Sequence, residues 1–440
     1  MVFRRIFERG SKAEPQTPPD DAAEGEVEVD VDAAEAEVEP DHPSWSDRAR
    51  KVLPTGASTG SKRVEALYGS RDAAAPTHFQ TAVGCRVTDV DGLEYFDCTM
   101  ALGAVALGYS EPNVTRAAVE AIASGSISGL SSFREVDLAE RLAGVIPCAD
   151  KVQFLKTGAE AMAAAVRLAR TYTARDIVVG SGYFGWLDWC SDDAEGVPAA
   201  TKALFRRVVY DDIASLEAAV SDAGSNLAAI VIEPVIERLP STEWIQRARE
   251  LATSHGAVLV FDEIKTGFRL ATGGYQQYAD VVPDLAAFGK AMANGYPLAA
   301  VVGDRDVMDA AQRTWISSTL ASEASALAAA AAVLSWHDTA DICASLWAVG
   351  ADLRRSITAA IDASGVQGVT VDGLDPMWLM RWDDPARERR FLELGATHGV
   401  LFKRGAYNFA ALAHDDEALQ AIEAGASAAF VDLRDEEAHQ

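Results

Sequence analysis

The chain is poor in cysteine and lacks long apolar runs. Its five cysteines are odd in number, scattered and without C-x-x-C spacing, which favours reduced, small hydrophobic side chains over a disulfide framework or a metal site. No uninterrupted apolar run approaches the roughly 18 residues that a membrane span needs. No P-loop or G-x-S-x-G motif occurs. The cysteines are Cys85, Cys98, Cys148, Cys190 and Cys343.

Basic residues are also scarce. The 39 Lys and Arg stand against 66 Asp and Glu, for a net charge of −27, and this charge argues against nucleic acid or an anionic membrane as a partner. Residues 1–7 include arginines but no apolar stretch follows them, which is not the pattern of a secretory signal. We therefore expect a soluble, cytoplasmic protein with no nucleic-acid or membrane partner.

The chain is long enough for more than one domain. With 440 residues, 49% of them hydrophobic, it can bury a large core. Residues 14–41 contain twelve Asp and Glu and no Lys or Arg, which indicates a disordered acidic tail that is either a solubilising extension or a docking arm. We expect a tail over 1–44, the first part of a small domain over 45–100, a large domain over 101–340 and the rest of the small domain over 341–440.

The middle of the chain alternates apolar strands with helices, which predicts an α/β fold with a mostly parallel sheet flanked by helices, beside a smaller α+β domain. Residues 84–97 predict a hairpin that turns at Asp91 and Gly92. Strands are expected at 151–155, 177–180, 228–233, 257–262, 299–302, 369–372 and 377–381. Helices are expected at 114–123, 159–170, 213–221, 242–254, 322–336, 385–397 and from 417 onward.

Lys290 is the residue that says most about chemistry. A surface charge is the ordinary role of a lysine, but Lys290 follows an apolar run and lies between Gly289 and Gly295. Asp262 ends a predicted buried strand 28 positions earlier (290 − 262). This pair suits pyridoxal phosphate, because a lysine amine condenses with the cofactor aldehyde and a carboxylate keeps the pyridine nitrogen protonated.

Other polar groups are expected at the same edge of the sheet, beyond the carboxyl ends of the strands. Glu233 follows one strand, and the turn 157–159 precedes a helix whose free amides and dipole favour a phosphate. Tyr183, in the aromatic segment 182–190, could stack on a cofactor ring or belong to an aromatic core. Residues 317–325 suit a second phosphate contact or plain N-capping, and we expect His414 to be structural.

Taken together, segments 87–97, 156–161, 232–234, 261–269 and 283–297 resemble the class III (fold type I) pyridoxal-phosphate aminotransferases over about residues 50–435. The similarity is greatest to the glutamate-1-semialdehyde aminomutase-like branch, and within it to members from polysaccharide and amino-sugar pathways, through 61–63, 100–109 and 164–172. The resemblance implies a homodimer with active sites shared between its subunits.

The resemblance also implies a role for each matching residue. Lys290 would be the Schiff-base lysine and proton shuttle, and Asp262 would hold the pyridine nitrogen. The remaining implied contacts are Gly158 and Ala159 with the phosphate, Thr319 with the phosphate from the neighbouring subunit, Tyr183 and Ile264 with the two ring faces, and Glu233 on the side of the ring hydroxyl.

Three departures from the family pattern bear on the reaction. Phe184 stands where a histidine usually follows the stacking tyrosine, which predicts the loss of a hydrogen-bonding group near the cofactor. Residues 318–323 replace the Gly-Thr-x-x-Gly-Asn-Pro type loop of the aminomutases, and residues 58–63 replace their Asn-Ser-Pro-Val-Arg segment. These changes count against amine exchange within one molecule.

We therefore expect an aminotransferase that moves an amino group from an amino acid such as L-glutamate to a small polar ketone or aldehyde, for example a keto-sugar. The alternative is a 2,1-aminomutase of the glutamate-1-semialdehyde type, which would need no separate donor. A catalytically idle scaffold is a third reading, and the presence of both Lys290 and Asp262 argues against it.

Overall fold

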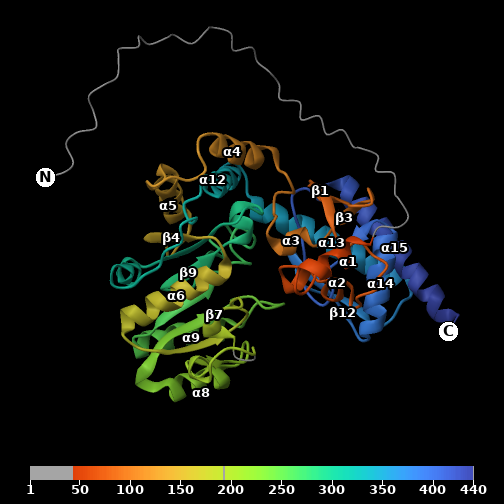
Figure 1. Ribbon diagram of the computed structural model, residues 1–440. Coiled ribbons are helices and arrows are strands. Elements are labelled where there is room, and N and C mark those ends of the chain that lie inside the picture. Colours follow the sequence, from red (N-terminus) through yellow and green to blue (C-terminus); the bar gives the residue numbers. More distant parts are fainter. Residues whose placement is uncertain (1–42, 192–193, 440) are drawn as a thin grey trace, which may run out of the picture. The chain divides into compact units, whose positions relative to one another are not determined.

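A seven-stranded sheet is the centre of the computed structural model, which describes residues 43–191 and 194–439 (Figure 1). β10 runs antiparallel to both of its neighbours, and all other neighbours in this sheet are parallel, so the mostly parallel sheet is confirmed. In spatial order the strands are β4 (Lys151–Leu155), β10 (Ala299–Gly303), β9 (Leu285–Phe288), β8 (Val258–Asp262), β7 (Leu227–Ile232), β5 (Ile177–Ser181) and β6 (Phe205–Arg207).

The two faces of this sheet carry separate cores. Because side chains alternate along a strand, Ile230 and Phe261 face one core and Val231 and Val260 face the other. The first core includes residues of α8 (Ile213–Ala223) and α9 (Thr242–His255), and the second includes residues of α6 (Gly158–Thr173). Covered on both faces, these strands need no polar side, which explains their uninterrupted apolar sequences.

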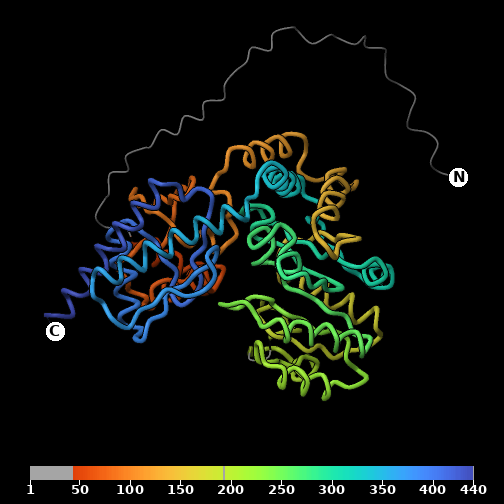
Figure 2. Tube along the Cα trace, turned by 180° about the vertical axis from the view of Figure 1, so that it is seen from behind, coloured from red at the N-terminus to blue at the C-terminus, as the bar shows by residue number. Residues whose placement is uncertain are grey.

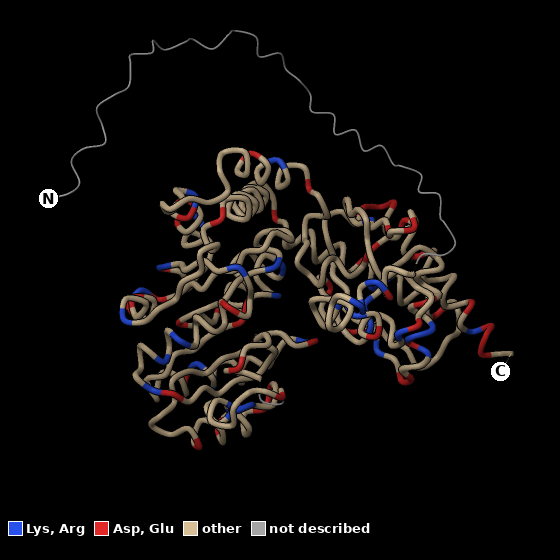
Figure 3. Tube along the Cα trace, in the orientation of Figure 1, with Lys and Arg blue, Asp and Glu red and all other residues tan. Residues whose placement is uncertain are grey.

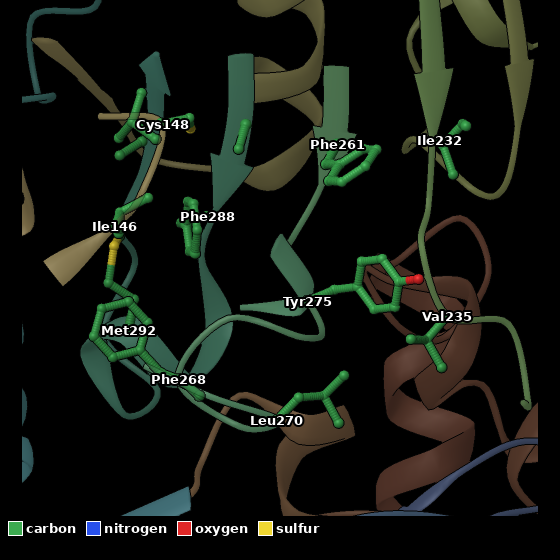
Figure 4. Close-up of a cluster of buried hydrophobic side chains, with 14 of the residues drawn as sticks. Ile146, Cys148, Ile232, Val235, Phe261, Phe268, Leu270, Tyr275, Phe288 and Met292 are labelled. Atoms are coloured by element: carbon green, nitrogen blue, oxygen red, sulfur yellow. The ribbon is translucent and has the colours of Figure 1, made fainter. Parts of the chain in front are cut away.

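Aromatic side chains fill the space below one edge of the sheet (Figure 4). Phe268 meets Phe288 edge to face with ring centroids 6.2 Å apart, and Phe261 meets Tyr275 in the same way at 6.0 Å. Met292 is fully buried beside them. The turn that holds Lys290 therefore stands on a rigid, well-packed base.

Two smaller sheets join distant parts of the chain. The predicted hairpin is confirmed, since β2 and β3 pair antiparallel. β13 adds to β3 in parallel, with Val400 opposite Phe96, 304 residues apart in the sequence (400 − 96). The second sheet is formed by β11, β12 and β14. The strands are β1 (Phe79–Val83), β2 (Arg86–Asp89), β3 (Glu94–Asp97), β13 (Val400–Leu401), β11 (Val369–Leu374), β12 (Met377–Trp382) and β14 (Asn408–Phe409).

The remaining helices can be followed along the chain in Figure 2. Every expected helix is present, whereas two longer helices, α5 and α13, and the shorter helices α1, α2, α3, α7, α10 and α11 were not predicted. The helices not yet given are α1 (Trp45–Val52), α2 (Val64–Tyr68), α3 (Met100–Gly103), α4 (Pro112–Ala123), α5 (Phe133–Val145), α7 (Ala199–Lys202), α10 (Tyr275–Ala279), α11 (Arg305–Met308), α12 (Ala324–Thr339), α13 (Ile342–Ser364), α14 (Pro385–Thr397) and α15 (Asp416–Ala438).

Arg269 ties three distant segments together. Its guanidinium is fully buried and donates to the carbonyl oxygens of Ala410 at 2.8 Å, Pro376 at 3.1 Å and Gly103 at 3.2 Å. Gly103 ends a left-handed turn in which Met100 to Leu102 have φ between 41° and 60°. Such backbone is unfavourable for residues with a side chain, so this turn depends on anchors of this kind.

Residues Met1–Ser44 and Trp45–Gln440 are separate units, and this description concerns the second. The acidic segment 14–41 lies outside the described residues, and the domain limits 45–100, 101–340 and 341–440 stay a prediction. Positive and negative side chains are interspersed along the described chain (Figure 3). All five cysteines are buried, and none of them forms a disulfide. Among the described residues, none of the helices is both long and apolar enough to cross a membrane.

Candidate active site

The sheet register places the ends of four strands side by side. Ser181 pairs with Ile232, Ile232 with Phe261, and Phe261 with Ala286. The next residues along these strands are Gly182, Glu233, Asp262 and Ala287, so Glu233 and Asp262 are neighbours at one edge. Lys290 follows at the end of β9, and the start of α6 follows β4 at the same edge. The sequence expectation for this edge is therefore met by Glu233, Asp262, Lys290 and the α6 turn.

Asp262 is a buried carboxylate, 5% exposed. One oxygen accepts the backbone N–H of Ile264 at 3.0 Å. Burial, followed by repulsion from Glu233, raises the pKa of Asp262 to about 8, although the Ile264 amide and the lysines Lys290 and Lys265 act in the opposite direction. A cation that binds beside this buried carboxyl group would stabilise its ionised form.

Lys290 begins the 3-10 turn Lys290–Ala293 and has a positive φ of 48°, a strained conformation of the kind that gathers at functional sites. The side chain is half-buried, and its amine has no hydrogen-bond or ion-pair partner among the described residues. Burial, then the charge of Lys265, lowers the pKa of Lys290 to about 8, against the opposing effect of Asp262 and Glu233. This amine is more often neutral, and hence nucleophilic, than an ordinary lysine.

A second lysine, Lys265, was not singled out from the sequence. Its ammonium donates to Glu233 Oε1 at 2.6 Å and to the Tyr407 hydroxyl at 3.2 Å. It also lies 4.3 Å from the centre of the Tyr407 ring. Burial acts against its charge, but Glu233 and Tyr407 outweigh burial and raise the pKa of Lys265. The two lysines therefore differ: Lys265 is held and charged, and Lys290 is not held.

The start of α6 offers backbone amides to an anion. Thr157 is the N-cap and forms a capping box with Glu160, so these two side chains satisfy each other. The amides of Gly158 and Ala159 have no partner within the described parts of the chain. A Cβ on Gly158 would lie 2.6 Å from Ile264 Cδ1. Glycine there lets Ile264 lie close to the helix start.

Tyr183 and Phe184 point in different directions. Tyr183 is 73% exposed, and its backbone N–H donates to Glu233 Oε2 at 2.9 Å. Phe184 is 2% exposed and stacks on Trp189 with ring centroids 5.7 Å apart, with Phe205 edge-on at 6.3 Å. The expected loss of a polar group beside the cofactor stays a prediction. Phe184 belongs to the aromatic core, whereas Tyr183 has a free ring.

Thr319 and His414 are not brought to this edge by any contact in the described residues. Thr319 is exposed in the turn before α12. Its neighbour Glu323 caps α12 through Ser325 N at 2.7 Å and accepts the Lys156 ammonium at 3.2 Å. His414 is 1% exposed, accepts the Ala411 N–H through Nδ1 at 3.1 Å and lies 3.1 Å from the Asp97 carbonyl through Nε2. His414 is structural, as expected.

Comparison with known proteins agrees with this geometry. A family model described as aminotransferase class-III matches residues 68–182 and 197–421. The chain belongs to the class-III aminotransferase family. It is 32% identical over 328 residues to 3-aminobutyryl-CoA aminotransferase of Cloacimonas acidaminovorans, covering 73% of this chain and 78% of that protein. It is also 32% identical over 391 residues to 2'-deamino-2'-hydroxyneamine transaminase of Streptomyces kanamyceticus, covering 86% and 97%.

Two further comparisons define the range of similarity. Glutamate-1-semialdehyde 2,1-aminomutase of Polynucleobacter asymbioticus is 28% identical over 429 residues, covering 88% of this aminotransferase and 98% of that protein. The structure of the FumI protein of Sphingopyxis sp. MTA144 with PLP matches with a TM-score of 0.84 at 27% identity, covering 90% and 96%. The fold is fold type I of the PLP-dependent transferases.

The cofactor of this aminotransferase is pyridoxal 5'-phosphate, and the residues at the sheet edge suit it. The unpaired amides of Gly158 and Ala159 suit a phosphate. The buried Asp262 carboxylate suits a cationic ring nitrogen, and the exposed Tyr183 ring suits a flat partner. An aldehyde suits the unpaired amine of Lys290.

Proposed function

We propose that this enzyme transfers an amino group from L-glutamate to a small polar ketone or aldehyde, such as a keto-sugar. Lys290 would carry the cofactor and move the substrate proton, and Asp262 would keep the ring nitrogen protonated. The other proposed cofactor contacts are Gly158, Ala159, Tyr183, Glu233, Ile264 and, from a second subunit, Thr319.

The contrast between the two lysines carries the assignment of Lys290. Lys265 is fixed by Glu233 and Tyr407 and keeps its charge. Lys290 has no such partner in the described residues, and its pKa is lowered to about 8. A nucleophile must be neutral and free to move, and a proton shuttle must exchange protons near working pH. Only Lys290 meets both demands.

The chain's own residues prepare the site for chemistry. When bound, pyridoxal phosphate supplies an aldehyde for a lysine amine and a ring that accepts electrons from a substrate carbon. Asp262 would hold a proton on the ring nitrogen through its charge, and the amides of Gly158 and Ala159 would bind the phosphate. Tyr183 would contact one ring face and Ile264 the other. The amine of Lys290 would take and return the proton on the substrate carbon.

The choice of acceptor is supported by one relative. The name of the Streptomyces kanamyceticus transaminase specifies 2'-deamino-2'-hydroxyneamine, and that protein aligns over nearly its whole length. A polar, hydroxyl-bearing acceptor is therefore our proposal here. The departures at 58–63 and 318–323 agree with a substrate other than glutamate semialdehyde.

The visible spectrum before and after addition of L-glutamate tests this proposal. We expect the purified protein to be yellow and the yellow band to bleach with glutamate, and we expect Lys290→Ala to lose both the band and turnover. A colourless protein that stays colourless with added pyridoxal phosphate would refute the assignment. Substantial turnover by Lys290→Ala would refute the role of that lysine.

The same experiment separates the transaminase from an aminomutase, which remains the second candidate because an aminomutase aligns over 88% of this chain. An aminomutase would leave the yellow band unmoved by glutamate and would convert an amino-aldehyde or a diamino compound with no donor. A transaminase would show ping-pong kinetics with separate donor and acceptor. A sequential pattern would count against it.

We also propose a homodimer in which Thr319 serves the neighbouring site. Large apolar side chains are exposed on and near the segment that holds Thr319 and on α5, including Trp315 at 80% and Phe133 at 67%, and such surfaces mark interfaces. Light scattering should give twice the chain mass. Mixing Lys290→Ala with Thr319→Asp subunits should restore activity that neither has alone, because one of the two mixed sites would be intact; no recovery would refute the sharing.

A cytoplasmic location and the domain limits proposed from the sequence complete this picture. Cell fractionation tests the location. Limited proteolysis tests the limits, since cleavage is expected near residues 44, 100 and 340 before it occurs within the sheets.

A further inference from the structure

The buried lysine at position 265 has a role that the cofactor assignment does not supply. We propose that Lys265 is a positioning residue: it is the counter-charge that holds Glu233 in place and, through Glu233, fixes the backbone of Tyr183 beside the cofactor. The proposal rests on the assignment of pyridoxal phosphate and is independent of the donor and the acceptor.

The first step is that the Lys265 side chain is buried and its ammonium is held by two hydrogen-bond partners. It is 8% exposed and its ammonium is shared between Glu233 Oε1 and the Tyr407 hydroxyl. A buried ammonium is tolerated only when its partners satisfy it, and these two partners are 174 residues apart in the sequence (407 − 233). The Tyr407 hydroxyl is itself fixed, because it accepts the Glu237 N–H at 2.6 Å.

The second step is that Glu233 transmits this position. Its Oε1 receives Lys265 and its Oε2 receives the Tyr183 N–H at 2.9 Å, so the carboxylate bridges the ammonium and the Tyr183 backbone. Gly182 brings the backbone before Tyr183 close to Glu233: its φ is 138°, and a Cβ there would lie 2.4 Å from Glu233 Cβ. A change in the direction of the Glu233 carboxylate therefore moves Tyr183.

The third step concerns charge. Glu233 and Asp262 stand at the ends of neighbouring strands, and the charge of Glu233 disfavours ionisation of Asp262. The charged or titratable groups that face Glu233 are Lys265, Asp262 and Lys290, and Tyr407 faces it across Lys265. Removing the Lys265 charge leaves Glu233 as a buried carboxylate without its hydrogen-bonded cation. The cationic ring nitrogen of the cofactor would then have to balance the charges of both Glu233 and Asp262.

The affinity of the apoprotein for pyridoxal phosphate tests the inference without any turnover. Lys265→Met keeps the length of the side chain and removes its charge. Loss of a hydrogen bond to a charged group lowers a binding affinity by roughly ten- to a hundredfold. We expect the Kd for pyridoxal phosphate to rise by that factor. Lys403→Met is the matched control, because Lys403 is 7% exposed and, within the described parts of the chain, its ammonium donates only to the carbonyl oxygens of Ala66 and Arg404.

A second variant and a pH series keep the test independent of folding defects. Lys265→Arg keeps a positive charge that can still donate to Glu233, so the Kd should return to within a few fold of wild type. In urea, apo Lys265→Met should lose more stability at pH 8 than at pH 5, because a buried carboxylate left without its cation is disfavoured in its charged form, whereas Lys403→Met should show no such excess. A Kd unchanged by Lys265→Met, an Arg variant as weak as the Met variant, or identical pH profiles of the two Lys→Met variants would each overturn the inference.

Discussion

The carboxylate of Asp262 makes a prediction that can be worked out in numbers. Burial and the neighbouring Glu233 raise its pKa from 3.8 to about 8 in the folded protein without cofactor. Between these two values the folded chain holds a proton that the unfolded chain has released. The contribution of this group to stability is therefore complete below about pH 4 and is lost as pH rises toward 8.

Replacing Asp262 by Asn removes this pH dependence. One pKa unit corresponds to about 1.4 kcal/mol, so between pH 5 and pH 7 the wild-type apoprotein should lose about 3 kcal/mol of unfolding free energy that Asp262→Asn does not lose. Urea unfolding at pH 5, 6 and 7, at one protein concentration, measures the difference between the two profiles. If the unfolding free energies of the two proteins change equally with pH, the pKa of Asp262 is not raised in the folded protein and the reasoning is refuted.

Saturating pyridoxal phosphate gives the same experiment a functional side. If the ring nitrogen is cationic opposite Asp262, it stabilises the ionised form of Asp262. The unfolding free energy of the wild type should then depend less on pH, as in Asp262→Asn. Glu263→Gln is the matched control, because Glu263 is also buried and has its pKa raised to about 7. Its carboxylate accepts hydrogen bonds from the Thr266 hydroxyl and from the N–H groups of Tyr275 and Gln276, and does not face the site. The cofactor should not change the contribution of Glu263.

Three further substitutions have definite outcomes. Gly182→Ala places a Cβ 2.4 Å from Glu233 Cβ at a φ of 138°, and this should cost about 1–3 kcal/mol of stability and weaken cofactor binding; unchanged binding in a dialysis assay would contradict it. Phe184→His, in the core against Trp189, should lower the free energy of unfolding by about 1–3 kcal/mol and leave the visible spectrum unchanged; a shifted spectrum would contradict the core position. Arg269→Met should cost on the order of 3 kcal/mol by stranding buried carbonyls, and an equal urea midpoint would speak against that.

Much of the site could be predicted because it lies at strand ends. Apolar runs that stop at Glu233 and Asp262, and an apolar run before Lys290, give both the strands and the edge at which they end. Parallel strands bring such residues together without any knowledge of the loops. The start of α6 is visible in the same way, from Thr157 followed by Glu160, which form a capping box.

Lys265 could not be found in this way. It occupies a position between apolar and polar neighbours where a lysine could equally face solvent, and its partner Tyr407 lies 142 residues further along the chain. The direction of Phe184 depends likewise on how the segment after β5 turns, and its partner Phe205 comes from another strand. The long helix α13 was missed, although an apolar pattern runs along it and Asp341 caps its start.

The arrangement of charges at the sheet edge explains why two lysines are present. A parallel sheet that ends adjacent strands in Glu233 and Asp262 forces two carboxylates together, and a single cation cannot satisfy both without moving. Lys265 is bound to Glu233 at 2.6 Å, which leaves Asp262 as the carboxylate without a hydrogen-bonded cation among the described residues. One open carboxylate matches one cationic ring nitrogen. The unpaired amine of Lys290 can then stay neutral, because neither carboxylate needs it as a permanent partner.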